Sequence, residues 1–177
     1  MGHPILDLIN KPSRLVIGFM SGTSADGIDA ALVRISGSGT DTKVQQLAFF
    51  FSPFAPEVRA EILRLAGGAP AAAADFCRIN FLLGRLCSEA GLELCRQAGL
   101  APGDIDLIGN HGQTFWHIPA EEEYLGRQIR STLQLGEDAV LAETFGCPVA
   151  GDFRVRDMAA GGLGAPLVPY TEFLLYR

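Results

Sequence analysis

The chain has 177 residues, of which 48% are hydrophobic, and a formal net charge of −6. This length and composition suit one domain with a well-buried core. The acidic balance, without a cluster of lysine or arginine, argues against nucleic acid or an anionic membrane as the main partner. No apolar run approaches the ~18 residues of a membrane span and residues 1–11 lack a signal-peptide pattern, so we expect a cytoplasmic protein. The cysteines form no CxxC pair and are expected to be reduced core residues: Cys77, Cys87, Cys95 and Cys147.

The first half of the chain is predicted to form three strands and two helices. The strands are expected at residues 14–20, 28–35 and 43–51. Within the third, the run Leu47–Phe51 is apolar enough to be buried on both faces of a sheet. A short helix follows Pro56, and a long helix runs from Pro70 to Gly99, with apolar residues at three- and four-residue steps that should pack on the sheet.

The second half alternates short strands with helices. Strands are expected at residues 107–110, 132–135 and 149–151, a helix at 137–145, and a polar hairpin or loop at 121–130. The chain stops inside what looks like an amphipathic helix. The order β-β-β-α-β-α-β predicts an α/β fold of the RNase-H-like type, with a mixed sheet of about five strands flanked by helices.

The turn between the first two predicted strands, Phe-Met-Ser-Gly-Thr-Ser-Ala-Asp-Gly at 19–27, is suited to cradle phosphate. Glycine lets the backbone approach a ligand closely, and Ser21, Thr23 and Ser24 offer hydroxyl and amide donors. Asp26 would repel phosphate, so its expected role is to hold Mg²⁺. No Gly-Lys-Ser/Thr follows, which excludes a Walker A loop and favours a phosphate-binding β-hairpin of the kind in actin, hexokinase and the Hsp70 ATPase. The alternative is an Asp-Gly hairpin turn with surface hydroxyls.

A second polar segment, His-Gly-Gln-Thr-Phe-Trp-His at 111–117, follows the strand predicted at 107–110. Ligands gather at the carboxyl ends of strands in α/β sheets. His111, Gln113 and Thr114 offer donors and acceptors suited to a sugar or an acyl amide. The alternative is that His111 satisfies backbone groups in a tight glycine turn.

A third segment, residues 152–166, is the densest set of charged and glycine residues. Asp152, Arg154, Arg156 and Asp157 are candidates to bind hydroxyls and a carboxylate. In an extended segment residues 152, 154 and 156 would share one face. An internal ion-pair network that fixes the loop is the alternative.

Four motifs in this order resemble the anhydro-N-acetylmuramic acid kinase family. They are Met-Ser-Gly-Thr-Ser-Ala-Asp-Gly-Ile-Asp at 20–29, His-Gly-Gln-Thr-Phe-Trp-His-Ile-Pro at 111–119, Thr-Leu-Gln-Leu-Gly at 132–136, and Asp-Phe-Arg-Val-Arg-Asp-Met-Ala-Ala-Gly-Gly-Leu-Gly-Ala-Pro-Leu-Val-Pro at 152–169. The resemblance runs from about Leu15 to the last residue. It departs at Ala25, where the family usually has leucine, and we expect this to alter packing under the loop more than its chemistry.

The resemblance implies an actin-like ATPase lobe and a sugar kinase of bacterial cell-wall recycling. Family members use ATP, Mg²⁺ and water to open 1,6-anhydro-N-acetylmuramic acid and phosphorylate it to N-acetylmuramic acid 6-phosphate. By this likeness the ATP site comprises Gly22, Thr23, Ser24, Ala25, Asp26, Gly27, Ile28 and Asp29, with Asp26 on the metal. The sugar site, or the residues that hold its pocket, comprises His111, Gln113, Thr114, Asp152, Arg154, Arg156 and Asp157.

The likeness also implies what this chain lacks. The water-activating aspartate of the family belongs to an Asp-x-Gly-Pro-Gly-Asn motif, which these 177 residues do not contain. We therefore expect this general base to lie beyond Arg177, and residues 1–177 to be the N-terminal lobe of a two-lobed kinase that needs its C-terminal lobe. A homodimer is one possible assembly. The alternatives are a non-catalytic sugar- or nucleotide-binding module, or an actin-type ATPase whose output is motion or assembly.

Overall fold

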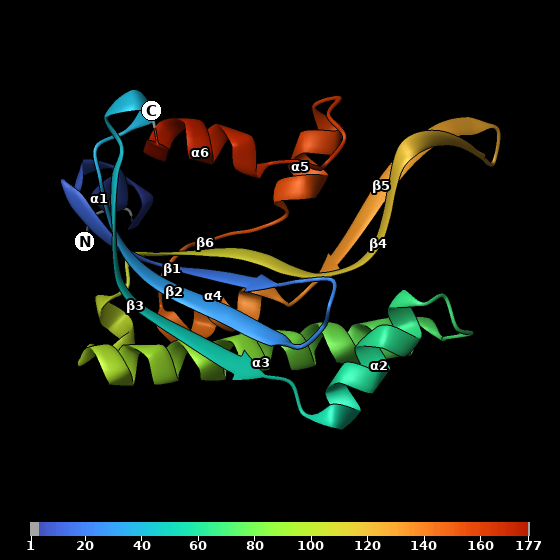
Figure 1. Ribbon diagram of the computed structural model, residues 1–177, viewed down its shortest axis with the longest axis horizontal. Coiled ribbons are helices and arrows are strands. Elements are labelled where there is room, and N and C mark those ends of the chain that lie inside the picture. The colour runs from blue at the N-terminus through green and yellow to red at the C-terminus, as the bar shows by residue number, and fades with distance from the viewer. Residues whose placement is uncertain (1–3, 177) are drawn as a thin grey trace.

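A computed structural model describes residues 4–176 as one mixed sheet with helices on both faces (Figure 1). The strands are β1 (Ser13–Ser21), β2 (Gly27–Ser36), β3 (Lys43–Pro53), β4 (Leu107–Tyr124), β5 (Arg127–Leu135) and β6 (Val149–Ala150). The helices are α1 (Pro4–Asn10), α2 (Pro56–Ala66), α3 (Ala73–Ala98), α4 (Asp138–Phe145), α5 (Phe153–Ala159) and α6 (Val168–Tyr176), with 3-10 turns η1 (Gly39–Asp41) and η2 (Pro102–Asp104).

The strand order is β3-β2-β1-β4-β5, and β6 pairs with β4 as well. The first three strands are antiparallel, whereas β4 runs parallel to β1 and β6 runs parallel to β4. This topology confirms the predicted α/β fold, with six strands in place of about five. Because β1, β4 and β6 are parallel, the carboxyl ends of β1 and β6 lie at the same edge of the sheet, beside residues 110–113 within β4.

The main core lies between the sheet and α3. Ile17, Leu32, Leu94 and Ile108 are fully buried there, and α2, α3 and α4 all cover this face (Figure 1). As predicted, α3 carries an apolar stripe and ends at Gly99, whose φ of 69° is the left-handed conformation of a helix cap. The helix begins at Ala73, three residues later than its predicted start at Pro70.

The prediction that Leu47–Phe51 is buried on both faces is wrong. β3 is the edge strand, and α3 packs on only one of its faces. Side chains alternate along a strand. Ala48 and Phe50 therefore reach the core, while Leu47, Phe49 and Phe51 point the other way and are 37–51% exposed.

The strand predicted at 107–110 is much longer than expected. β4 continues to Tyr124 because it pairs with β5, and together they form a hairpin that extends beyond the sheet (Figure 1). The predicted polar hairpin at 121–130 is confirmed at its tip. The His-Gly-Gln-Thr motif thus lies within a strand, not after one.

The cysteines are free thiols, and the core prediction holds for two of them. Cys87 and Cys95 are buried, Cys147 is half-buried, and Cys77 is exposed, contrary to expectation. Burial raises the pKa of Cys87 to about 12, with a further contribution from the charge of Asp138. Thiols with raised pKa are poor nucleophiles, so Cys87 is a packing residue.

Candidate functional site

The phosphate turn comprises residues 22–26 between β1 and β2. Thr23, Ser24 and Asp26 are exposed, and a backbone hydrogen bond from the Ala25 amide to the Gly22 carbonyl (3.1 Å) closes the turn. The next element is the antiparallel strand β2, which confirms the predicted strand–turn–strand arrangement. Hydroxyl groups and one carboxylate therefore face solvent at the carboxyl end of β1.

Ala25 anchors this turn in the hydrophobic core. Its side chain is fully buried in a cluster with Ile62, Leu65 and Phe115, and its φ of 49° is left-handed. A non-glycine residue in this conformation is uncommon and needs surrounding structure to hold it. The location agrees with the expectation that residue 25 affects packing under the loop.

Three further contacts hold the turn. The Phe54 amide donates to the Asp26 carbonyl (3.0 Å), and Nη2 of Arg59 donates to the Ser24 carbonyl (3.3 Å). Oγ of Ser21 lies 2.8 Å from the Gly27 carbonyl. Sequence reasoning missed Arg59, an exposed cation beside a turn suited to anions; its place in the first turn after the proline that opens α2 was the available signal.

Asp26 is the carboxylate at the phosphate turn. It is exposed, and its Oδ1 accepts a hydrogen bond from Oγ of Ser24 (2.8 Å). No group of three or more His, Cys, Asp or Glu within the described residues forms a metal cage. Mg²⁺ in nucleotide sites is commonly held by one or two carboxylates, phosphate oxygens and water, so a single exposed Asp26 fits that ion.

The last two residues of the expected ATP set differ in exposure. Ile28 is buried in the core, so only its backbone can face a nucleotide. Asp29 is half-buried in β2, opposite Met20 of β1.

Gln113 and Ser21 link the two neighbouring strands. The Gln113 side chain is 2% exposed, its Oε1 lies 2.6 Å from Oγ of Ser21, and its Nε2 donates to the Thr114 carbonyl (3.1 Å). Both polar atoms of Gln113 thus have partners within the chain. A direct contact to a sugar would require it to give up one of these bonds.

His111 has partners on both ring nitrogens. Its Nδ1 lies 2.9 Å from the Gly112 carbonyl, and Nε of Arg154 donates to Nε2 at 3.0 Å. Arginine can only donate, so Nε2 is the acceptor and Nδ1 carries the proton. The structural role considered for His111 is therefore present, and the second contact holds Arg154 beside His111 on β4.

The expectation of an extended segment at 152–156 is wrong. Asp152 is left-handed with a φ of 54°, and α5 begins directly after it. Residues two apart on a helix are separated by about 200°, so Arg154 and Arg156 point to different sides. Arg154 donates to His111, whereas Arg156 lines an apolar cavity of about 870 Å³ between the sheet and α6, which His111 lines as well.

The glycine loop after α5 is braced by two side chains. Oδ2 of Asp157 accepts from the Gly164 amide (2.8 Å), and Nη1 of Arg130 donates to the carbonyls of Gly161 and Gly162 (3.3 and 3.4 Å). No ion pair joins Asp152, Arg154, Arg156 and Asp157 within residues 4–176. Hydrogen bonds, rather than the considered ion-pair network, hold this loop.

Asp138 is a carboxylate that sequence reasoning missed. Its Oδ1 accepts from Nδ2 of Asn110 (2.7 Å), and its carboxyl group lies against Gly151, where a Cβ would overlap it. Burial raises the pKa of Asp138, and the charges of Asp152 and Glu137 raise it further, while the Asn110 bond lowers it. No sequence motif marks Asp138, because its position beside Gly151 depends on the packing of α4 against β6.

Comparison with known proteins decides the family. The chain matches the family model described as anhydro-N-acetylmuramic acid kinase over residues 14–177. This chain belongs to the anhydro-N-acetylmuramic acid kinase family. The enzyme of that name from Caldanaerobacter subterraneus subsp. tengcongensis is 57% identical over 98% of this chain and 44% of its own length. Those from Bacillus thuringiensis subsp. konkukian and Bacillus cereus strain AH187 are 46% and 48% identical over 92% of this chain and 42% of theirs.

The chain thus spans less than half the length of these anhydro-N-acetylmuramic acid kinases. The general-base aspartate is expected beyond Arg177, and Arg177 itself lies outside the residues that the structure describes, so the position of the base stays a prediction.

A comparison with solved structures adds little. The structure titled "Cryo-EM structure of CasPhi-2 (Cas12j) bound to crRNA and Phosphorothioate-DNA" overlaps 76% of this chain and 25% of its own with a TM-score of 0.19 and 12% identity. That overlap is too poor to bear on fold or function. No helix within residues 4–176 combines the length and apolar character that a membrane crossing requires.

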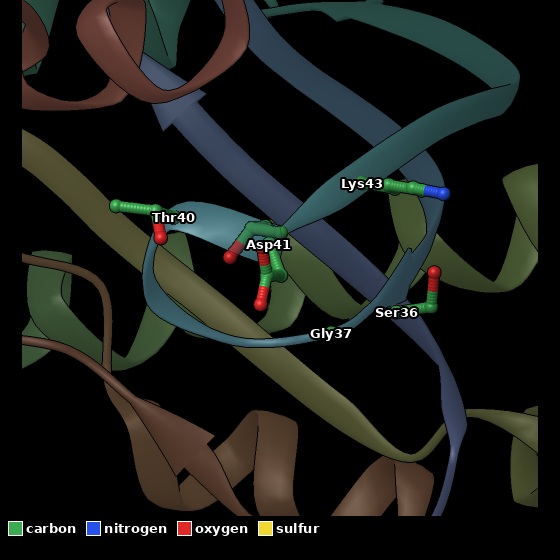
Figure 2. Close-up of a pocket in the computed structure, with 6 residues that line it drawn as sticks. Ser36, Gly37, Thr40, Asp41 and Lys43 are labelled. Carbon is green, nitrogen blue, oxygen red and sulfur yellow. The ribbon is translucent and has the colours of Figure 1, made fainter.

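The fold brings the family motifs to one edge of the sheet. The phosphate turn follows β1, His111 lies within β4, and Asp152 follows β6, so the three lie at the same edge of the sheet although β4 itself continues past His111. A hollow of about 440 Å³ lies at the other end of β2, where Thr40 and Lys43 point away from each other (Figure 2). It lies far along β2 from the phosphate turn and does not belong to this site.

Proposed function

We propose that this chain supplies the phosphate turn and part of the sugar site of an anhydro-N-acetylmuramic acid kinase. The observation that carries the proposal is the adjacency of a hydroxyl-rich hairpin turn after β1 to His111 and Arg154, which come from β4 and α5. The turn is suited to bind phosphate oxygens, and the pair of His111 and Arg154 is suited to bind hydroxyls and a carboxylate. Family membership supports the same assignment.

In this proposal ATP and Mg²⁺ bind at the turn. Donors from residues 22–27 would contact the phosphates, and Asp26 would hold the metal, whose positive charge would offset the negative charge of the phosphates. His111, Thr114, Asp152 and Arg154 bind the sugar or shape its pocket. The reaction opens 1,6-anhydro-N-acetylmuramic acid with water and phosphorylates it to N-acetylmuramic acid 6-phosphate. We assign it to the cytoplasm, where ATP is made.

We also propose that a C-terminal lobe completes the cleft and supplies the general base. The relatives carry more than half of their length outside the matched region. The sheet face opposite α3 is incompletely covered: α6 has no buried residue, and the cavity beneath it is lined mainly by apolar side chains. A second copy of the chain is the other candidate to cover this face. The mass of the full-length protein in solution distinguishes a two-lobed monomer from a homodimer.

A sugar-dependent kinase assay tests the proposal. Full-length protein with ATP and Mg²⁺ should release ADP only when 1,6-anhydro-N-acetylmuramic acid is present, and residues 1–177 alone should not turn over. ADP release independent of sugar would favour the actin-type ATPase, and binding without turnover would favour a binding module. A rate of ~1 to 100 s⁻¹ from residues 1–177 alone would refute the need for a second lobe.

A further inference from the structure

The Ser21–Gln113 contact lies where the backbone pairing of two strands is interrupted. β1 and β4 pair regularly up to Phe19 and Asn110, and their register then shifts, so that Ser21 pairs with Gln113. Two residues of β1 thus span three of β4, which is a bulge. Gly112 lies in it with a left-handed φ of 69°.

At this bulge a contact between side chains joins β1 to β4. The Ser21 hydroxyl lies within hydrogen-bond distance of both Oε1 of Gln113 (2.6 Å) and the Gly27 carbonyl (2.8 Å). Ser21 is the last residue before the phosphate turn, and Gly27 is the first residue after it. The hydroxyl has one proton, which the two acceptors share, and through it this buried group joins β4 to the residues on either side of the turn.

We propose that Gln113 is a positioning residue for the nucleotide, acting through Ser21 to hold the phosphate turn, and that it does not contact the sugar. The inference rests on the proposed kinase function. Gln113 and Ser21 are 2% and 5% exposed, so neither side chain is free to reach a ligand. A buried hydrogen-bond acceptor that loses its donor is costly, so the turn is held in one position.

Steady-state kinetics of the full-length protein separate this role from a sugar contact. Gln113→Leu should raise the KM for ATP about tenfold and leave the KM for the anhydro-sugar within about twofold. The control is Gln97→Leu, because Gln97 is an exposed glutamine near the C-terminal end of α3 whose Nε2 donates to Glu93 (2.8 Å), away from the turn. This control should change neither KM. A rise in the sugar KM alone, or an equal rise in both, would overturn the proposal.

A double-mutant cycle with Ser21→Ala tests whether the two residues act together. If they form one link, the double variant should have nearly the same KM for ATP as the more severe single variant. If the fold-increases in the KM for ATP of the two single variants multiply in the double variant, the two residues act independently and the link is refuted. Should Gln113→Leu fail to fold, Ser21→Ala alone must show the same shift in the KM for ATP but not for sugar.

Amide hydrogen exchange tests the link without relying on turnover. In nucleotide-free protein, Gln113→Leu should speed exchange of the amides at 22–27 about tenfold relative to the wild type, while amides of α3 stay unchanged. Unchanged exchange in the turn would contradict the proposal. If the wild-type protein phosphorylates no sugar, the proposed function fails, and exchange still decides whether Gln113 holds the turn.

Discussion

Nε of Arg154 donates a hydrogen bond to Nε2 of His111 at 3.0 Å, joining two motifs that are 43 residues apart. The bond fixes the guanidinium of the half-buried Arg154 beside His111 on β4. It uses one of the five N–H groups of the guanidinium and leaves the terminal nitrogens to meet a ligand. A carboxylate is the ligand best matched to that fork.

Arg154→Ala should weaken sugar binding. We expect the KM for the anhydro-sugar to rise roughly tenfold or more in the full-length protein, which is ~1.4 kcal/mol or more, with the KM for ATP nearly unchanged. Arg156→Ala should have a smaller effect, because Arg156 lies on another side of α5. Arg85→Ala, at an exposed position of α3, controls for the loss of an arginine. A lowered melting temperature with unaltered sugar affinity would show that Arg154 only braces His111.

Asp26→Asn should impair use of the metal. The change keeps an acceptor for the Ser24 hydroxyl but removes the charge, so turnover should fall sharply and the Mg²⁺ requirement should rise with the fold intact. Titration of activity with Mg²⁺ measures this. Asp41→Asn, at the other end of β2, is the matched control and should match the wild type. Wild-type turnover of Asp26→Asn at limiting Mg²⁺ would reduce Asp26 to a hairpin residue.

Gly84→Ala should destabilise the protein although alanine favours helices. The gain in helix propensity is about 1 kcal/mol. A Cβ at Gly84 would lie 2.8 Å from the Glu137 carbonyl oxygen, however, so α4 would have to move. We expect a lower melting temperature than that of Gly103→Ala, whose Cβ would meet nothing within 4 Å. Equal melting temperatures would show that α4 shifts without cost.

Asp138→Asn should stabilise the ligand-free protein at neutral pH. Since burial raises the pKa of Asp138, the folded state binds its proton more tightly than the unfolded chain does. The stability that this contributes is fully present below the unfolded-state pKa of about 4 and is lost as pH rises through the folded-state pKa of Asp138. Asparagine cannot ionise, so the melting temperature of the Asp138→Asn variant should exceed that of the wild type at pH 7. The difference between the two melting temperatures should become smaller towards pH 4. A lower melting temperature at pH 7 would mean that the carboxylate charge is stabilising here.

Local pattern predicted most elements of the fold, and long-range pairing explains the errors. The apolar spacing of α3 and the glycine after it were sufficient to predict a long helix. In contrast, the length of β4 depends on pairing with β5, and the exposure of Phe49 and Phe51 depends on β3 being an edge strand.

The site was predictable as a set of motifs but not as contacts. The sequence indicated the turn at 22–26, with its glycine and hydroxyl residues. In contrast, the sequence around Asp152 contains no pattern that predicts the short helix α5, so the separation of Arg154 from Arg156 could not be predicted. Arg59 and Asp138 lie outside the motifs, and only packing brings them near the strand ends.

The most direct test of the kinase assignment is the reaction of full-length protein with ATP, Mg²⁺ and 1,6-anhydro-N-acetylmuramic acid in ¹⁸O-labelled water, with the product read by mass spectrometry. Ring opening by water joined to phosphoryl transfer predicts N-acetylmuramic acid 6-phosphate with one ¹⁸O at the anomeric carbon and none in the phosphate. Label in inorganic phosphate with the sugar unchanged would contradict the assignment and indicate an ATPase.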